Sequence, residues 1–212
     1  MKPIFACVLK LGGDYLPEHV AILANQVKKH TTIDYEFICI TDYTEPIEGA
    51  TTIPLIKKYP GWWSCVELYR LVGPVVAVGV DTMIKGNIDG LFELIKKTSE
   101  KDFWMIRAFR GQNKTISGIL GWNGDWSRLF VDFCFQKTVN RLRGDEDYVN
   151  LQLSKYGTIP SILQDSFPGI YSYKRHCLKG IPKNCSVLVF HGHPRPFEVP
   201  HLWKPLVEEL NK

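Results

Sequence analysis

Long apolar runs, paired cysteines and blocks of basic charge are all missing from this sequence. No apolar run approaches the ~20 residues of a membrane span, and no cleavable apolar signal segment is visible, so we expect a cytoplasmic protein with no membrane span. The six cysteines include no C-x-x-C pair, which predicts reduced core thiols. The net charge is only +4 and basic residues run no longer than pairs, which argues against nucleic-acid binding. In the cytoplasm the sequon Asn113-Lys114-Thr115 is expected to be an unmodified polar loop.

What is present indicates one α/β domain. A chain of 212 residues, 45% of them hydrophobic, can bury one sizeable core, so we expect a single domain over 1–212. Strand and helix patterns alternate, as in a sheet flanked by helices. The closing residues 201–212 look like a helix cut short, which predicts the front part of a longer protein. Strands are predicted at 3–9, 35–42, 51–56, 75–80, 102–109, 115–122 and 186–192, and helices at 17–30, 62–72, 89–97, 126–138 and 145–156.

Two acidic residues stand at the ends of predicted strands. The apolar run Val75–Val80 stops on Asp81, and the strand at 35–42 stops on Asp42. Ligands of open α/β sheets bind at the carboxyl ends of the strands, so both acids are candidate ligand-binding residues. The alternative at each position is an acid that favours a turn for local reasons.

Five segments, taken in order, resemble a known family. They are FICITD, GWWSCVELYRLVGPVVAVGVDTMIKGNIDGLFEL, SGILGW, GDEDYVN and VFHGHPRPFEV, and the resemblance spans nearly the whole chain, from the first strand to Val199. The chain is similar to the GT-A nucleotide-sugar glycosyltransferases, most like family eight and its small viral and bacterial relatives, among them chlorella-virus enzymes thought to decorate the capsid. The resemblance implies a single Rossmann-like GT-A domain with a mixed central sheet flanked by helices.

The resemblance further implies a UDP-sugar donor, a divalent cation (Mn²⁺ or Mg²⁺) and transfer that retains the anomeric configuration. The family holds the cation with an Asp-x-Asp at a strand end and a distant histidine. The matching residues here are Asp81 and His191, and Gly79 stands where the first acid is expected. A hard cation accepts mixed oxygen and imidazole ligands, with diphosphate oxygens and water completing the shell. The alternative for His191 is a structural histidine.

The same resemblance implies contacts to the diphosphate and the nucleotide. Gly192 and Arg195 match the diphosphate-binding loop, with arginine where the family usually has lysine. A solvated loop arginine is the alternative. Trp62 and Trp63 are candidates for stacking on a base or a sugar, and a core role is the alternative. The positions matched to nucleotide and donor contacts are Asp42, Tyr43, Ser64 and Arg70.

The acidic pair Asp145-Glu146 opens the helix predicted at 145–156. The family has Gly-Asp-Gln here, facing the donor sugar, so Glu146 replaces a glutamine. A carboxylate beneath the anomeric carbon would stabilise positive charge there or act as a transient nucleophile, so both acids are the candidate catalytic residues. The alternative is that acids in a first helical turn only complement the helix dipole.

Departures from the family pattern keep other functions open. Gly79, Cys65 and Ile116 replace an acid, a lysine and an asparagine, and together they favour a degenerate domain that binds a nucleotide sugar or a glycan without turning it over. A haloacid-dehalogenase-like phosphotransferase is a third alternative, from GVDTM, but it would need an Asp-x-Asp on an early strand. The sequence thus predicts a glycosyltransferase that moves a hexose or deoxyhexose to a glycan or glycoprotein acceptor, with a viral capsid in a host cytoplasm as one setting.

Overall fold

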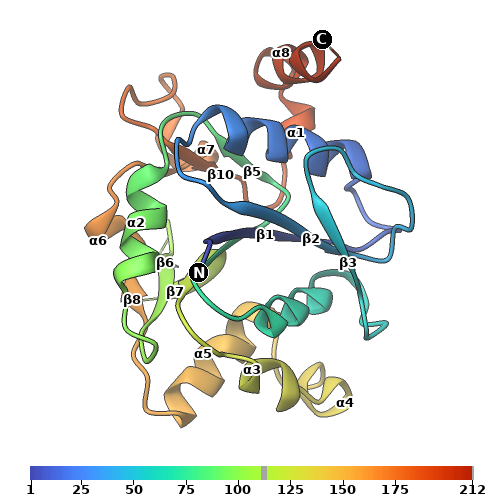
Figure 1. Ribbon diagram of the computed structural model, residues 1–212, viewed down its shortest axis with the longest axis vertical. Helices are drawn as coiled ribbons and strands as arrows, with labels where there is room; N and C mark the ends of the chain where they lie inside the picture. The colour runs from blue at the N-terminus through green and yellow to red at the C-terminus, as the bar shows by residue number, and fades with distance from the viewer. Residues whose placement is uncertain (111–113, 212) are drawn as a thin grey trace.

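Two β-sheets and the helices around them form the part of the chain that the computed structural model describes, residues 1–110 and 114–211 (Figure 1). Asn113 of the predicted sequon lies outside these residues. The main sheet has seven strands in the order β3-β2-β1-β4-β7-β6-β8. In chain order they are β1 (Ile4–Leu9), β2 (Glu36–Thr41), β3 (Thr51–Pro54), β4 (Val75–Val78), β6 (Phe103–Arg107), β7 (Thr115–Trp122) and β8 (Ser161–Ile162).

The main sheet is mixed in strand direction. β3, β2, β1 and β4 pair in parallel, β7 pairs antiparallel with β4 and β6, and β8 pairs parallel with β6. The second sheet has three short strands in the order β5 (Thr82–Ile84), β10 (Val187–Val189) and β9 (Ile170–Ser172). The predicted α/β fold with a mixed central sheet flanked by helices is therefore confirmed.

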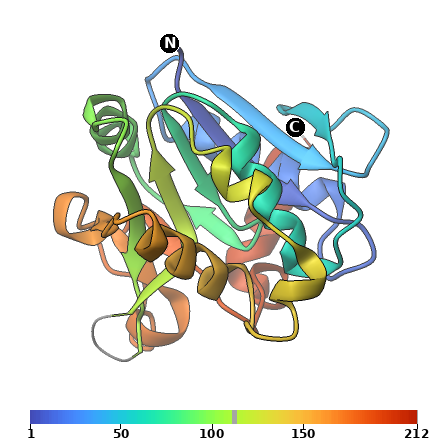
Figure 2. The same cartoon turned by 90° about the horizontal axis from the view of Figure 1, so that it is seen from below.

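Helices cover both faces of the main sheet. One face carries α1 (Pro17–Lys29), α2 (Asp89–Lys97) and the second sheet; the other, in view in Figure 2, carries η1 (Gly61–Arg70), α3 (Arg128–Val131), α4 (Phe135–Thr138) and α5 (Asp145–Lys155). The remaining helical segments are α6 (Leu163–Ser166), α7 (Tyr173–His176), η2 (Pro196–Glu198) and α8 (Pro200–Leu210). Across the described residues, no helix is long and apolar enough to cross a membrane.

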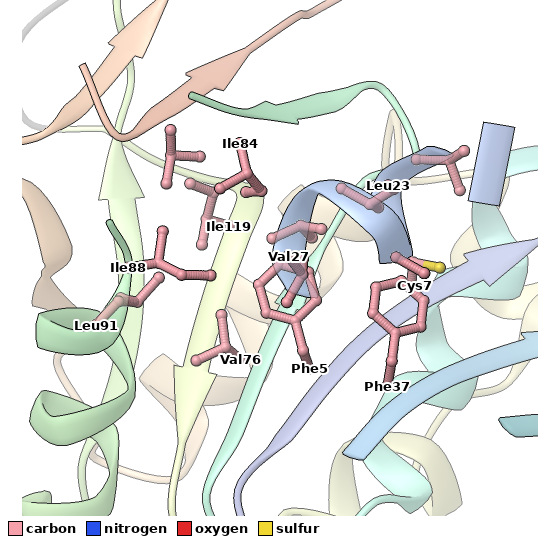
Figure 3. Close-up of a cluster of buried hydrophobic side chains, with 14 of the residues drawn as sticks. Phe5, Cys7, Leu23, Val27, Phe37, Val76, Ile84, Ile88, Leu91 and Ile119 are labelled. Carbon is pink, nitrogen blue, oxygen red and sulfur yellow. The ribbon is translucent and has the colours of Figure 1, made fainter. Parts of the chain in front are cut away.

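The alternation of side chains along the central strands builds a core on each face. In β1, Phe5 and Cys7 point to the α1 side, where they meet Leu23 and Val27 (Figure 3). Ala6, between them, points to the opposite core. Side chains of a strand alternate between the two faces of its sheet, so a strand covered by helices on both sides is apolar at every position. This double burial explains the near-continuous apolar runs in the sequence.

Several predicted elements differ from the structure. The helix predicted at 62–72 is the 3-10 helix η1, and the strand predicted at 186–192 is limited to β10. The strand predicted at 75–80 ends at Val78, because a turn follows in which Thr82 N donates to Gly79 O at 3.0 Å. The helix predicted at 126–138 is instead two short helices, α3 and α4. Between them Phe133 is buried, with its ring edge-on to Tyr148 at 4.8 Å between centroids. The end of β4 at Val78 moves Asp81 from a strand end into a turn.

Candidate active site

Loops from several strands meet at one edge of the main sheet. β1, β2 and β4 are parallel, so their carboxyl ends lie together. β7 runs the other way, which brings its first residues to the same edge, where Gly79 N donates to Gly118 O at 3.4 Å. The end of β10 reaches this edge too, because Phe190 N donates to Asp81 O at 3.3 Å. The predicted metal ligands Asp81 and His191 therefore lie on neighbouring backbone segments.

Asp81 lies in the turn between β4 and β5 with its side chain 21% exposed. Its carboxylate lies over Gly79, since a Cβ atom on residue 79 would collide with Asp81 Oδ1. On the strand predicted at 75–80 and continued to Asp81, residues 79 and 81 would point to the same side. The turn instead folds the Asp81 carboxylate into the space that a side chain at position 79 would fill. Burial raises the pKa of Asp81 to about 6, although the Arg195 guanidinium opposes the shift. The group is thus mainly ionised at neutral pH.

Arg195 is held in place by charge and by an aromatic ring. Its Nε and Nη2 donate to Asp14 Oδ2 at 3.1 and 3.0 Å, and its Nη1 lies 3.5 Å from Asp81 Oδ2. The guanidinium carbon lies 5.3 Å from the centre of the Tyr15 ring. The Tyr15 hydroxyl lies near Asp81, and burial together with the Asp81 charge raises the pKa of this hydroxyl. Arg195 is therefore a cation held by two carboxylates and a ring, not a solvated loop side chain.

His191 is held beside a cavity by two contacts. Its Nε2 lies 2.8 Å from the Ser172 hydroxyl, and its ring stacks on Phe109 with 5.8 Å between centroids. Burial lowers the pKa of His191, and the positive charges of Lys174 and Arg110 add to the effect. The imidazole is therefore neutral near pH 7, which is the form that binds metals.

The donor set fits a cation only if a substrate completes it. Asp81 supplies an ionised carboxylate and His191 a neutral imidazole. The carboxylate lies at ion-pair distance from Arg195, and the imidazole contacts the Ser172 hydroxyl. The described residues hold no cluster of three or more His, Cys, Asp or Glu side chains arranged for a metal. Two protein ligands are sufficient where substrate phosphates and water supply the rest of the shell. The geometry thus allows a nucleotide-dependent Mn²⁺ or Mg²⁺ site and argues against a tight site in the free protein.

Asp145 and Glu146 begin α5 on the opposite side of the cleft. Burial raises the pKa of Asp145 to about 6; the Glu146 charge adds to this, and a hydrogen bond from Ser117 opposes it. Glu146 forms an ion pair with Lys114 at 2.6 Å. Asp145 thus has no cation bound to it among the described side chains, whereas the charge of Glu146 is balanced.

The Cys65 thiol, in η1, is affected by the charges of both acids. Burial raises the pKa of its thiol well above the ordinary value, and the charges of Asp145 and Asp81 both add to the shift. One side chain from η1 is therefore within electrostatic reach of both acids, which are far apart in sequence.

Two adjoining cavities form this cleft. One, of about 340 Å³, is lined by His191, Phe109, Ile116, Lys174 and Glu146 among others, and the second, of about 260 Å³, by Trp62, Ser117, Asp145 and Glu146 among others. Lys114 and Glu146 line both, so the cavities adjoin. A larger cavity of about 500 Å³ lies elsewhere, between residues 100–102 and 156–159 at the amino ends of β6 and β8. Because α/β sheets bind ligands at the carboxyl edge, we assign function to the first two.

The remaining predicted residues lie in two places: the loops after β2 and β10, and the helix η1. Asp42 lies at the carboxyl end of β2, where it accepts from Leu11 N at 2.8 Å and from Lys10, and Tyr43 follows it, partly buried. These contacts outweigh partial burial and lower the pKa of Asp42. Gly192, with φ at +68°, makes the left-handed turn after His191 that disfavours a side chain.

Ser64 and Arg70 do not line the cleft cavities. Ser64 is buried, and its hydroxyl donates to Gly61 O at 2.7 Å within η1. Arg70 donates to Pro54 O at 3.1 Å and pairs with the fully buried Glu67. The prediction that both contact the donor gains no support from this placement, because each is committed to holding η1. Trp63 is buried in the core, whereas Trp62 is 62% exposed and lines the smaller cavity.

Sequence reasoning missed several residues of the site. Asp14 and Tyr15 follow a Gly-Gly pair at the carboxyl end of β1, so the strand-end rule that selected Asp42 and Asp81 would have found them. Lys114 and Lys174 carried no such signal. The helix α7, which bears Lys174, is only four residues long.

The partly buried Asp145 gives a prediction for the dependence of stability on pH. Its pKa lies near 3.8 when solvated and at about 6 in the fold, so the folded state binds the proton more tightly. The free energy of unfolding therefore falls as pH rises from about 4 to 6, by on the order of 2 to 3 kcal/mol for this group. Asp145→Asn should then be more stable than wild type at pH 7, and the advantage should vanish near about pH 4. Urea unfolding across this range measures it, and a pH-independent difference would contradict the assignment.

Solved structures with known activity share this architecture. The galactosyltransferase LgtC, in complex with donor and acceptor sugar analogues, aligns with a TM-score of 0.67 at 11% identity, over 98% of this chain and 95% of its own. This chain has the GT-A glycosyltransferase fold. The glycosyltransferase GlyE of Streptococcus pneumoniae TIGR4 aligns in its apo form with a TM-score of 0.68 at 14% identity, over 100% of this chain and 62% of its own.

A third similar structure is an active-site mutant of LgtC in which glutamine is replaced by glutamate. It aligns with a TM-score of 0.62 at 12% identity, over 98% of this chain and 95% of its own. No protein-family model matches the sequence, and no curated protein matches it. The likeness is therefore one of fold, and the function has to be argued from the cleft.

Proposed function

We propose that the protein is a glycosyltransferase that moves a hexose or deoxyhexose from a UDP-sugar to a glycan or glycoprotein acceptor, with retention of the anomeric configuration. The supporting observation is the composition of the cleft. Arg195, Asp81 and His191 lie on adjoining segments after β4 and β10, the partly buried Asp145 lines the smaller cavity, and Cys65 is within electrostatic reach of both acids. LgtC, which shares the fold, is a galactosyltransferase.

The donor would lie along the carboxyl edge of the sheet. In this arrangement Asp42 and Tyr43, after β2, contact the uridine, and Gly192 and Arg195 contact the diphosphate. A guanidinium can bind two phosphate oxygens at once, and an ordered one loses little entropy on binding. A divalent cation held by Asp81 and His191 would add positive charge for the departing diphosphate. The sugar then extends toward α5.

The carboxylate of Asp145 would act on the anomeric carbon. As the bond to UDP breaks, this carbon gains positive charge, and a buried anion with no bound cation stabilises that charge more than a solvated one does. Glu146 is held by Lys114 and so positions the sugar and the start of α5. We infer that Glu146 stands where LgtC has the active-site glutamine that its mutant replaces with glutamate. Retention follows if Asp145 bonds transiently to the sugar and the acceptor then displaces it, because each of the two displacements inverts the anomeric carbon. If Asp145 only stabilises the charge, retention requires the acceptor to attack from the face that UDP leaves.

A degenerate domain that binds a nucleotide sugar or a glycan without turnover is the second candidate. Two features favour it. At the turn, the Asp81 carboxylate occupies the space beside Gly79 where the family has a second acid, and the apolar Ile116 lines the cavity of about 340 Å³. Incubation with a panel of UDP-sugars separates the two functions. Release of UDP, with or without an acceptor, supports the enzyme, whereas binding of the same sugars without release supports the degenerate domain.

UDP and Mn²⁺ should stabilise the protein together by more than the sum of their separate effects. The reason is that the protein offers two cation ligands and the diphosphate must supply others. At about 100 times its dissociation constant, the nucleotide complex should add about 2.7 kcal/mol to the free energy of unfolding. Thermal melting with each ligand alone and with both measures the coupling. If EDTA leaves the UDP-induced shift in melting temperature unchanged, the cation part of the proposal is wrong.

A further inference from the structure

The segment Ser172–Lys174 brings a second cation to the diphosphate loop. Ser172 holds His191 through its hydroxyl, and two residues later Lys174 Nζ donates to His193 O at 2.8 Å. The same ammonium would lie 3.5 Å from a Cβ atom on Gly192. Lys174 also lines the larger cavity of the cleft together with His191. Its ammonium therefore lies at the loop where the diphosphate is proposed to bind.

The charge of Lys174 is not balanced by an acid. Within the described residues no carboxylate lies at ion-pair distance from it, whereas Arg195 pairs with Asp14 and Asp81, and Lys114 with Glu146. Its positive charge nonetheless acts on both predicted metal ligands, because it lowers the pKa values of Asp81 and His191. A partly buried cation with no anionic partner in a concave site favours an anionic ligand.

We propose that Lys174 is a diphosphate-binding residue that gives the site a component of nucleotide affinity independent of any metal. The inference rests on the proposed function, since it assumes a nucleoside diphosphate as the anion. Its ammonium has three donors, and one is used by His193 O. The other two are available to phosphate oxygens. Binding therefore adds contacts at Lys174 without breaking the bond that holds the loop.

Titration calorimetry in EDTA tests the proposal with UDP, UMP and uridine as probes. Lys174→Met should weaken UDP binding by about 10- to 100-fold, the value of a charge-assisted hydrogen bond, and leave uridine binding within about twofold. Lys174→Arg should restore most of the UDP affinity. Lys179→Met is the matched control, since Lys179 is an exposed lysine of the same region. Its UDP affinity should equal that of wild type.

The outcomes separate this inference from the proposed function. Equal UDP affinity in wild type and Lys174→Met overturns the inference, and so does an equal loss for uridine and UDP, which would mean that Lys174 only supports the fold. If wild type binds UDP with Mn²⁺ but not in EDTA, the inference fails and the proposed donor stands. If UDP binds under neither condition, the proposed donor is wrong and the inference falls with it.

Discussion

Asp145→Asn should lower kcat by about 100- to 1000-fold and leave the Kd for UDP within about threefold of wild type. The substitution keeps the shape and the contact with Ser117 but removes the negative charge that faces the proposed position of the anomeric carbon. That charge is needed mainly when the bond to UDP is breaking, so its loss affects turnover more than binding. Single-turnover rates and UDP titrations, with the UDP-sugar that gives the highest rate, provide both numbers.

Two further variants make this test specific. Glu146→Gln should reduce kcat less than Asp145→Asn, because the Glu146 charge is already balanced by Lys114. Asp34→Asn removes a carboxylate that is 87% exposed, just before β2 at the other edge of the sheet, and should change neither parameter. Equal losses of turnover and UDP affinity in Asp145→Asn would assign the acid to the fold of α5 instead of to the chemistry.

The main sheet was predictable because burial on both faces leaves a mark in the local sequence, a continuous apolar run. β1 and β4 are apolar at every position, and the proline at the start of α1 fixes where that helix begins. In the second sheet only β10 left such a mark, within the strand predicted at 186–192. β5 and β9 are three residues long, and they pair only through β10, which comes from a distant part of the chain. Their existence depends on tertiary pairing, which a local pattern cannot show.

The residues of the candidate site also differ in whether a local sequence pattern reveals them. Asp42 and Asp81 were found because each follows a long apolar run, and the same rule would have found Tyr15 after β1. Lys174 could not be found in this way, because its place depends on the pairing of β9 with β10. Arg70 shows what a family position leaves out. The position predicts a donor contact, and the structure adds an ion pair between Arg70 and the buried Glu67 that the sequence analysis did not foresee.

Asp81→Asn should weaken Mn²⁺ binding in the presence of UDP by at least about 100-fold. Partners that only orient a metal ligand contribute about 10- to 100-fold in affinity, and Asp81 is proposed as a direct ligand. The protein should remain folded, because the side chain lies at the cleft and asparagine keeps its volume. Calorimetric titration of Mn²⁺ into the UDP-saturated protein measures the effect, with Asp34→Asn as the control. Unchanged Mn²⁺ affinity would show that Asp81 is not a metal ligand.

The same variant should have the opposite effect when the metal is removed. In EDTA the Asp81 carboxylate is a negative charge 3.5 Å from Arg195 and close to the proposed diphosphate position, so it repels the nucleotide and competes for the guanidinium. Asp81→Asn should therefore leave UDP affinity in EDTA equal to wild type or raise it by up to about tenfold. A loss in EDTA as large as the loss with Mn²⁺ would mean that Asp81 acts by holding Arg195 in place. A loss confined to Mn²⁺ requires that the carboxylate acts through the cation.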